Sequence, residues 1–450
     1  MKLLPEWMRY SRRWAMPIKV PKGWQLSKLR DHIFEKRVRI KKATQGVVVV
    51  SVSNQFGIRD SKNTFGRQVH SEDIGNYKKI QQGWFAYNPS RINVGSIAKH
   101  DEKFIGALSP MYVVFEVNSE FLTIDYASQF IESERFQQRV KCNLQGSVRQ
   151  ALTFDALQSF PFALPTKQEQ GAIVHALKQF DRVIEQALGN EARLTKAKFD
   201  LMRNILTCGY KGNAPFKPIP QKWILGRVAE NLTQIPADWS LVRLTSVAKL
   251  ESGHTPSRKK PEYWIDGNIP WISLQDAHGL DSIQISATNE CINQLGIDNS
   301  SARLLPKDTV VLQRTANIGL SSRMGRPMCT SQHFANWVCG DKLHPGYLVQ
   351  VFKHMKREWK RLQAGSVLPD IYMTTFKKLQ ILLPPIEEQI KIAEIGEAFD
   401  LRIEAETAYL TELKKTKQAL AQELLSGRVR LPQSMIDRFK ESEEISESAA

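Results

Sequence analysis

Two long stretches of the chain repeat apolar residues at alternating spacings of four and three positions. The first copy carries Ile173, Leu177, Phe180 and Ile184 on this spacing, and the second copy begins with Ile392. A seam of this kind, without an internal proline, is typical of a coiled-coil helix. Roughly 39 residues at ~1.5 Å per residue predict two rods of about 58 Å each. Because one narrow apolar seam cannot bury itself, we expect the two helices to pair with each other.

The two helices are copies of one sequence pattern. At a constant offset, Pro165 matches Pro384, Glu169-Gln170 matches Glu388-Gln389, and Phe180-Asp181 matches Phe399-Asp400. Lys198 and Lys417 also occupy one shared position, inside an otherwise apolar seam. A buried lysine is unfavourable unless it is paired. We therefore expect both lysines to reach a carboxylate or to approach a bound partner, with an exposed edge position as the alternative.

The repetition extends into the segments that precede the helices. The matching groups are Gly146-Ser147-Val148 with Gly365-Ser366-Val367, Pro21, Trp24 and Leu26 with Pro236, Trp239 and Leu241, and Asn93-Val94-Gly95 with Asn317-Ile318-Gly319. The chain is therefore one unit written twice, a globular segment followed by a long helix.

Within each globular segment, strand-like and helix-like patterns alternate. Strands are predicted at Val47–Val52 and Met111–Val117 and a helix at Tyr126–Val140; in the second copy the corresponding predictions are strands near Thr309–Gln313 and Phe334–Cys339 and a helix from about Gly346 to Leu362. This mixture predicts a fold of the α/β (mixed) class, with two repeated α/β domains and two long coiled-coil helices that pair with each other. Trp239 and Trp271 are expected in the core.

The pattern divides the chain into seven segments. They are a basic N-terminal arm (1–19), a first domain (20–165), a first helix (166–209), a linker rich in Pro and Gly (210–234), a second domain (235–384), a second helix (385–430) and an acidic tail (431–450).

Charge changes the picture, because the formal net charge is +17 at pH 7. The positive excess lies mainly in the arm and the two globular segments, while the helices are close to neutral. This distribution favours domains that face a polyanion and helices that face protein, with basic surfaces that merely aid solubility as the alternative. No apolar run approaches the ~18 residues of a membrane span. The five cysteines form no C-x-x-C pair, so we expect buried thiols in a reducing cytoplasm.

The sequence lacks the motifs of the common catalytic sites. It has no phosphate-binding G-x-x-x-x-G-K-[ST] and no G-x-G-x-x-G after a strand. Tyr87-Asn88-Pro89-Ser90 superficially resembles the Asn-Pro-Pro-Tyr loop of amino-methyltransferases, but it lacks the second proline and the stacking aromatic residue. Cys329, His333 and Cys339 fit no usual zinc spacing, so a core role is favoured. We predict no catalytic residue, no metal and no cofactor.

Two stretches resemble a known family. They are Gly365-Ser366-Val367 through Pro384-Pro385-Ile386-Glu387-Glu388-Gln389 with the following helix, and Ser252-Gly253-His254-Thr255-Pro256-Ser257 followed by Tyr263-Trp264 and Ile269-Pro270-Trp271-Ile272. They resemble the DNA specificity (S) subunit of type I restriction–modification systems, over nearly the whole chain. His254 stands where a second glycine is usual in that family, and Pro165-Thr166 replaces the double proline in the first copy.

The resemblance implies two target-recognition domains, each reading half of a bipartite sequence in double-stranded DNA. It also implies that two antiparallel helices hold these domains apart and dock two methyltransferase subunits, with restriction subunits joining outside them. The subunit itself would perform no chemistry. Two alternatives stay open: the targeting half of a single-chain restriction–methylation enzyme, and a coiled-coil scaffold that does not bind DNA.

Reading a DNA sequence requires donors and acceptors on loops that enter a groove, with arginine best suited to guanine and asparagine or glutamine to adenine. In the first domain the candidates are Ser53, Asn54, Gln55, Arg59, Lys62, Asn88, Arg91, Asn93 and Arg149. In the second domain they are His254, Thr255, Ser257, Arg258, Lys259, Gln275, Asp276, Arg314, Asn317, Ser331, Gln332 and Ser366. For each one, the alternative is a loop-capping role or contact with a phosphate.

Overall fold

The computed structural model describes residues 19–40, 46–54, 57–61, 74–144, 150–212, 215–219, 223–363 and 369–437. The chain forms two compact units. Unit 1 contains the described residues up to Glu185 together with those from Thr411 onward, and unit 2 runs from Gln186 to Leu410. Each unit therefore combines one globular domain with parts of both long helices, and the fold belongs to the mixed α/β class that the sequence predicts.

Unit 1 builds its domain around two four-stranded sheets with the orders β2-β9-β6-β7 and β4-β3-β8-β5. Its elements are β1 (Gln25–Lys28), η2 (Leu29–Asp31), β2 (Ile33–Glu35), β3 (Val48–Ser53), β4 (Gly57–Asp60), β5 (Lys78–Ile80), β6 (Phe85–Tyr87), η3 (Ile92–Val94), β7 (Ile97–Lys99), β8 (Gly106–Leu108), β9 (Val113–Val117), α3 (Ile124–Glu132), α4 (Glu134–Asn143), α5 (Phe154–Gln158) and β10 (Pro161–Leu164).

The single helix predicted over Tyr126–Val140 is wrong, because two helices meet at Ser133. Ser133 has extended backbone angles (φ −65°, ψ 144°), and its side chain accepts a hydrogen bond from the backbone N–H of Phe136. A serine in this conformation ends one helix and caps the next. The break turns α4 so that Phe136 packs edge-on against Phe130.

Unit 2 contains a five-stranded sheet with the order β14-β21-β18-β19-β16 and a three-stranded sheet with the order β17-β15-β20. Its elements are β11 (Phe216–Pro218), β12 (Gln234–Pro236), β13 (Ser240–Arg243), η4 (Leu244–Ser246), β14 (Ala248–Ser252), η5 (Pro261–Tyr263), β15 (Ile269–Ile272), η6 (Leu274–Leu280), β16 (Gln284–Ile285), β17 (Glu290–Ile292), α7 (Gln294–Asp298), β18 (Val310–Gln313), β19 (Ser321–Met324), β20 (Cys329–Thr330), β21 (Phe334–Cys339), α8 (Pro345–His354), α9 (Lys356–Leu362), α10 (Met373–Phe376) and β22 (Gln380–Leu383).

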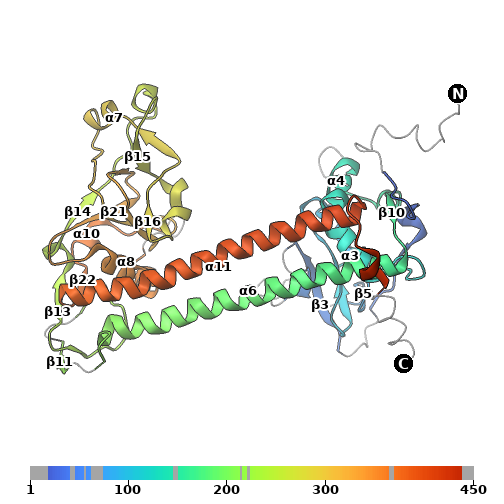
Figure 1. The fold of residues 1–450 in the computed structure, drawn as a ribbon, viewed down its shortest axis with the longest axis horizontal. Coiled ribbons are helices and arrows are strands. Elements are labelled where there is room, and N and C mark those ends of the chain that lie inside the picture. Colours follow the sequence, from blue (N-terminus) through green and yellow to red (C-terminus); the bar gives the residue numbers. More distant parts are fainter. Residues whose placement is uncertain are drawn as a thin grey trace. The chain divides into compact units, whose positions relative to one another are not determined.

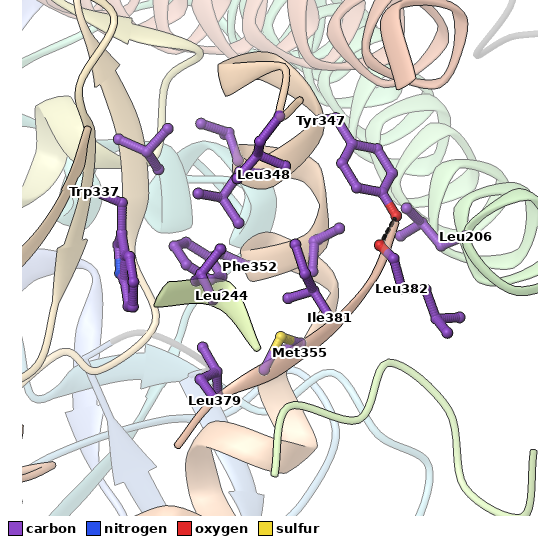
Figure 2. Packing of buried hydrophobic residues seen from close by; sticks show 14 of the residues in the cluster. Leu206, Leu244, Trp337, Tyr347, Leu348, Phe352, Met355, Leu379, Ile381 and Leu382 are labelled. Atoms are coloured by element: carbon purple, nitrogen blue, oxygen red, sulfur yellow. Dashed lines mark hydrogen bonds between the residues drawn. The ribbon is translucent and has the colours of Figure 1, made fainter. Parts of the chain in front are cut away.

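One core of unit 2 contains residues of α8 and of the strand β22. Figure 2 shows Tyr347 pointing to the carbonyl of Leu382, with Leu206 of the first long helix beside it. Trp239 is fully buried in the same core, and Trp271 is buried in a separate cluster with Ile292 and Cys329, so both tryptophans are buried as expected. The one helix predicted from Gly346 to Leu362 is instead two, because Met355 leaves the helical conformation between α8 and α9.

The predicted linker 210–234 does more than connect. Its strand β11 pairs with β12 from Phe216↔Pro236 to Pro218↔Gln234. Trp223 is buried in the core of unit 2 and donates from Nε1 to the carbonyl oxygen of Gln380 over 3.3 Å. This segment therefore belongs to the packed domain of unit 2.

The two long helices are α6 (Lys167–Cys208) and α11 (Ile386–Ser426), and they lie side by side (Figure 1). They pack antiparallel. In unit 2, Lys198 Nζ lies 2.5 Å from Asp400 Oδ1. In unit 1, Lys417 Nζ lies 2.5 Å from Asp181 Oδ1. The expectation that both seam lysines reach carboxylates is confirmed, and each carboxylate belongs to the repeated Phe-Asp pair of the opposite helix.

The repeated Glu-Gln pair locks each domain to the start of its helix. In unit 1, the indole N–H of Trp24 donates to Glu169 over 2.9 Å; in unit 2, Trp239 donates to Glu388 over the same distance. The glutamine that follows is buried. Gln389 donates to the carbonyls of Pro384 and Lys342 and accepts from the backbone N–H of His344.

The same lock forms in unit 1, where Gln170 donates to the carbonyls of Pro165 and Phe121 and accepts from Thr123 N–H. An antiparallel strand pair, β1 with β10 and β13 with β22, closes each domain beside it. The motif shared by the two copies is therefore structural: it fixes a helix to a domain.

The two locks are completed differently. In unit 1, Arg430 donates to both carboxylate oxygens of Glu169, and Leu424 and Leu425 of α11 enter the domain core. In unit 2, the backbone N–H of Tyr210 donates to Glu388 over 3.3 Å.

Among the described residues, no helix combines the length and apolarity that crossing a membrane requires.

Candidate nucleic-acid interface

In unit 2, two tryptophans support the loop that carries the candidates from His254 to Arg258. Trp271 donates from Nε1 to the carbonyl of His254 over 3.0 Å, and Trp264 donates to the carbonyl of Ser257 over 3.3 Å. The two indole rings meet edge to face, with centroids 5.0 Å apart. The loop therefore rests on a rigid aromatic base, which limits the entropy lost when its side chains bind a ligand.

Arg258 packs over these tryptophans and is hydrogen-bonded to a carboxylate. Its guanidinium lies 3.7 Å from the ring centroid of Trp264 and donates to both carboxylate oxygens of Glu290, over 2.5 and 2.7 Å. The hydrogen bonds from Arg258 lower the pKa of the Glu290 carboxyl. Half of the Arg258 side chain is exposed, so the pair lies at the surface.

A second arginine, Arg314, forms a clamp. It donates from Nη1 to both oxygens of Asp370 over 2.8 Å and to the carbonyl of Ile371 over 2.7 Å. Thr315 also donates to Asp370. Ala316 has a positive φ of 64°, a rare conformation for a residue with a side chain, and Asn317 follows it as an exposed residue. Strained backbone held by such contacts is common at functional sites.

Gln332 contacts both Arg314 and the loop that carries Thr255. Arg314 donates from Nε to the carbonyl of Gln332, and the hydroxyl of Thr255 donates to the side chain of Gln332 over 2.6 Å. Thr255, Arg314 and Gln332, three candidates far apart in the sequence, therefore lie together in unit 2. Lys259 and Gln275 are also exposed.

Two other candidates of unit 2 are buried. Asp276 accepts hydrogen bonds from the backbone N–H and the hydroxyl of Ser273 and from Asn289, and Ser331 is 1% exposed. These positions favour a structural role, in which Asp276 completes a capping box at the start of η6.

In unit 1, Asn54 lies beside the turn that contains Asn93 and Gly95. A Cβ built on Gly95 would lie 3.5 Å from the Cβ of Asn54, and the hydroxyl of Ser96 donates to the carbonyl of Val52. Asn54 is exposed and Asn93 is half-buried. Gly95 has a φ of 86°, so a side chain there would strain the turn. Ser53 comes directly before Asn54 at the end of β3.

The other candidates of unit 1 differ in accessibility. Arg59 is exposed and pairs with Glu102 over 3.1 Å. Arg91 is exposed, whereas Asn88 is 9% exposed and accepts from the backbone N–H of Ser90. Tyr87 is fully buried, so it is not placed to stack on an extruded base. Gln55, Lys62, Arg149 and Ser366 lie outside the described residues.

Sequence reasoning missed the carboxylates that hold the arginines and one exposed aromatic residue. Asp370 and Glu290 are separated from Arg314 and Arg258 by long stretches of sequence, and no local pattern links them. Tyr372 is 62% exposed and comes two residues after Asp370. The sequence alone does not single out Tyr372, because its significance depends on the Arg314–Asp370 pair, which only the structure reveals.

Cys329 is buried and Cys339 packs, partly buried, against the core of unit 2, as expected, whereas Cys142 is exposed, so the expectation of buried thiols is wrong for that residue. Burial raises the pKa of both Cys329 and Cys339 to about 12, so neither thiol is a ready metal ligand. Within the part of the chain that the structure describes, no group of His, Cys, Asp or Glu residues is arranged to hold a metal ion.

Comparison with known proteins gives consistent matches. A family model described as the type I restriction modification DNA specificity domain matches residues 21–194 and again 236–415. The type I restriction enzyme MjaIX specificity subunit of Methanocaldococcus jannaschii is 34% identical over 176 residues, which cover 39% of this chain and 40% of that relative. The MjaVIII specificity subunit of the same organism is 21% identical over 430 residues, covering 92% of this chain and 95% of the relative.

A solved chain agrees with the fold. It comes from a study of the complex assembly and conformational transition of the type I R-M system, and it matches with a TM-score of 0.56 at 18% identity. The match covers 92% of this chain and all of the solved chain. At this identity the likeness concerns the fold alone.

Proposed function

The chain belongs to the type I restriction modification DNA specificity family, and from this premise we propose that it is a DNA sequence-specificity subunit that reads a bipartite target. The observation that carries the proposal is the duplication: the family domain occurs twice in one chain. Two copies of a reading domain with different loops favour two different half-sites. Each half-site would be read by one unit.

Polar side chains on the exposed or half-buried loop tips would make the sequence-reading contacts. In unit 2 these are Gln332 and Asn317 beside the Arg314 clamp, and in unit 1 they are Asn54 and Asn93. Amide side chains suit adenine, and a good bidentate contact discriminates by about 1–3 kcal/mol. Ser53, Arg59, Arg91, His254 and Ser257 would contribute further base or phosphate contacts. The net charge of +17 supports attraction to the DNA backbone.

The paired helices would dock the methyltransferase subunits. On the part of α11 within unit 2, Leu401 is 59% exposed and Tyr409 is 49% exposed. Leu401, Ala405 and Ala408 recur at spacings of four and three, so they form one stripe on the helix surface. Leu410, which packs into the pairing seam, is 4% exposed. An apolar stripe in addition to the seam supports a protein partner.

The subunit would be non-catalytic, and restriction subunits would join through the methyltransferases. This part of the proposal rests on the family and on the sequence, which offers recognition loops and no set of residues for acyl, phosphoryl or methyl transfer. Methylation and cleavage would come from the partner subunits.

Gel-shift titration with and without the methyltransferase subunits tests the proposal. We expect specific binding of a duplex that carries both half-sites, found by methylation-sensitive sequencing of the host genome. Asn317→Ala should weaken binding about 5- to 100-fold at one half-site and Asn93→Ala at the other. Gln418→Ala, at an exposed position of α11, is the control. Methylation by the chain alone would favour the single-chain enzyme, and binding without sequence preference would contradict the proposal.

A further inference from the structure

A cavity of about 450 Å³ opens in unit 1 between α4 and the last turns of α11. Three basic residues and one acidic residue stand among its lining residues. The basic residues are Lys19, Arg135 and Arg428, and the acidic residue is Glu134. Gln422 donates a hydrogen bond to Glu134, and Phe130 and Leu425 are apolar lining residues. We name this feature the basic cavity.

The lining of the basic cavity holds more cations than carboxylates. Burial, and then the neighbouring Arg428, lower the pKa of Arg135. One helical turn further along α4, burial and Arg135 lower the pKa of Arg139 to about 10. Arg428 does have a partner, since it pairs with Glu423 over 2.7 Å. Clustered guanidinium groups without enough counter-charge destabilise a fold, and their presence indicates an anionic ligand.

The position of the cavity indicates which anion. Helix α4 packs against η3, the turn that contains Asn93, and Ile92 and Val140 share one core. Ten residues of α-helix span about 15 Å. The cavity therefore lies within a few base pairs' reach of the proposed reading tip of unit 1. Its lining begins at Lys19, directly after an N-terminal segment that carries Lys2, Arg9, Arg12 and Arg13.

We propose that the basic cavity binds a phosphate of the DNA backbone beside the first half-site, with Arg135 as its central contact and Arg428 of the long helix as the second. The inference rests on the proposed function. It gives the end of α11 a part in DNA binding in addition to its part in helix pairing. Arginine suits this role because its planar guanidinium can donate two parallel hydrogen bonds to one phosphate.

The test compares Arg135→Gln with Arg182→Gln, which removes the same charge from an exposed position of α6 in the same unit. Both variants are assembled with the methyltransferase subunits. Arg135→Gln should weaken binding of specific and unrelated duplexes alike, about 5-fold, and reduce the slope of log K against log salt by about one. Thermal stability should stay unchanged or rise, because a poorly compensated cation is removed. A residue with a purely structural role would lower stability instead.

Ethylation interference then locates the contact. In the wild-type complex, ethylating one phosphate within about five base pairs of the first half-site should block binding, and the Arg135→Gln complex should be insensitive to it. If the wild type binds its target and Arg135→Gln behaves like Arg182→Gln, the phosphate site is wrong while the proposed function stands. If the wild type shows no sequence preference, the proposed function itself fails.

The acidic tail is the competing occupant, because it carries Glu441, Glu443, Glu444 and Glu447. Its carboxylates could neutralise the same guanidinium groups. A chain that ends after Lys440 separates the two cases. If DNA fills the cavity, this truncation should leave both DNA affinity and the effect of Arg135→Gln unchanged. If the truncation lowers stability and abolishes the effect of Arg135→Gln, the tail fills the cavity and the inference is overturned.

Discussion

At the scale of single residues, buried glutamines and carboxylates hold each domain to its helix. Gln389 and Glu388 are both buried, and between them they bind one indole N–H and several backbone groups. A side chain that satisfies buried backbone groups is expensive to remove, because those groups lose their only partner and have no water to replace it. The Glu-Gln pair is therefore an anchor point of the fold in both units.

Replacing Gln389 by alanine should lower the stability of unit 2 by about 2–4 kcal/mol, because the carbonyls of Pro384 and Lys342 and the N–H of His344 would be left unpaired. Urea unfolding measures the change. Gln418→Ala, at an exposed position of the same helix, is the matched control and should change stability by no more than about 0.5 kcal/mol. Equal effects of the two substitutions would contradict the anchoring role of Gln389.

His354 should make stability depend on pH. Burial, then Arg203, lowers its pKa to about 4 from an ordinary 6.5. The unfolded chain therefore binds a proton between about pH 6.5 and 4 that the folded chain refuses, so stability is complete above pH 6.5 and falls as the pH drops. The shift corresponds to at most ~3 kcal/mol, and solvent screening reduces this to about 1–2 kcal/mol.

The measurement is the difference in unfolding free energy between about pH 7.5 and 4.5. His354→Phe should reduce the difference while preserving the stack on Phe199, whose ring centroid lies 4.8 Å from that of His354. His175→Phe, at a histidine on the surface of α6, provides the comparison. An unchanged pH dependence in His354→Phe would assign it to other groups.

At the scale of secondary-structure elements, the helices were the most predictable part. Their spacing and the positions of Lys198 and Lys417 are explicit in the sequence, and the structure confirms both the pairing and the carboxylate partners. The breaks at Ser133 and Met355 were missed, because the apolar pattern continues through them. The Arg314–Asp370 and Arg258–Glu290 pairs were also missed, since only the tertiary fold brings those residues together.

The exposed stripe of α11 leads to a prediction about assembly. Leu401→Asp should weaken binding of the methyltransferase subunit more than about 10-fold, because a carboxylate would be buried without a partner in a docked surface. Stability of the free chain should be unaffected, since Leu401 is exposed. Isothermal titration of purified subunits measures the affinity. Gln418→Asp adds the same charge elsewhere on the helix, and an equal loss from it would argue against the stripe.

At the scale of the whole molecule, two continuous helices cross from one unit to the other, α6 at Glu185 and α11 at Leu410. The sequence predicts this duplication, although it could not predict that residues from Thr411 onward complete unit 1. A sequence repeat relates positions along the chain, whereas closure of unit 1 depends on the antiparallel register of the two helices, in which Arg430 meets Glu169.

Adding one heptad to both helices, after Glu185 and after Leu410, should lengthen the spacer between unchanged half-sites by about three base pairs. Seven residues add ~10.5 Å and preserve the seam, and each base pair adds ~3.4 Å. Methylation-sensitive sequencing reports the new target. The same insertion in α6 alone should destabilise the helix pair, because the two helices would no longer match in length. A double insertion that altered the half-site bases and preserved their spacing would refute a ruler role.

The closure of unit 1 by α11 also sets an order of events during synthesis. Trp24 and Leu424 share one core, about 400 residues apart, and translation at roughly 5–20 residues per second separates their emergence by on the order of 20–80 s. Unit 2, from Gln186 to Leu410, is contiguous and leaves the ribosome complete before that interval ends. Although the domain of unit 1 is synthesised first, its core is completed last. Until α11 has been synthesised, the apolar residues that α11 covers in unit 1 stay exposed.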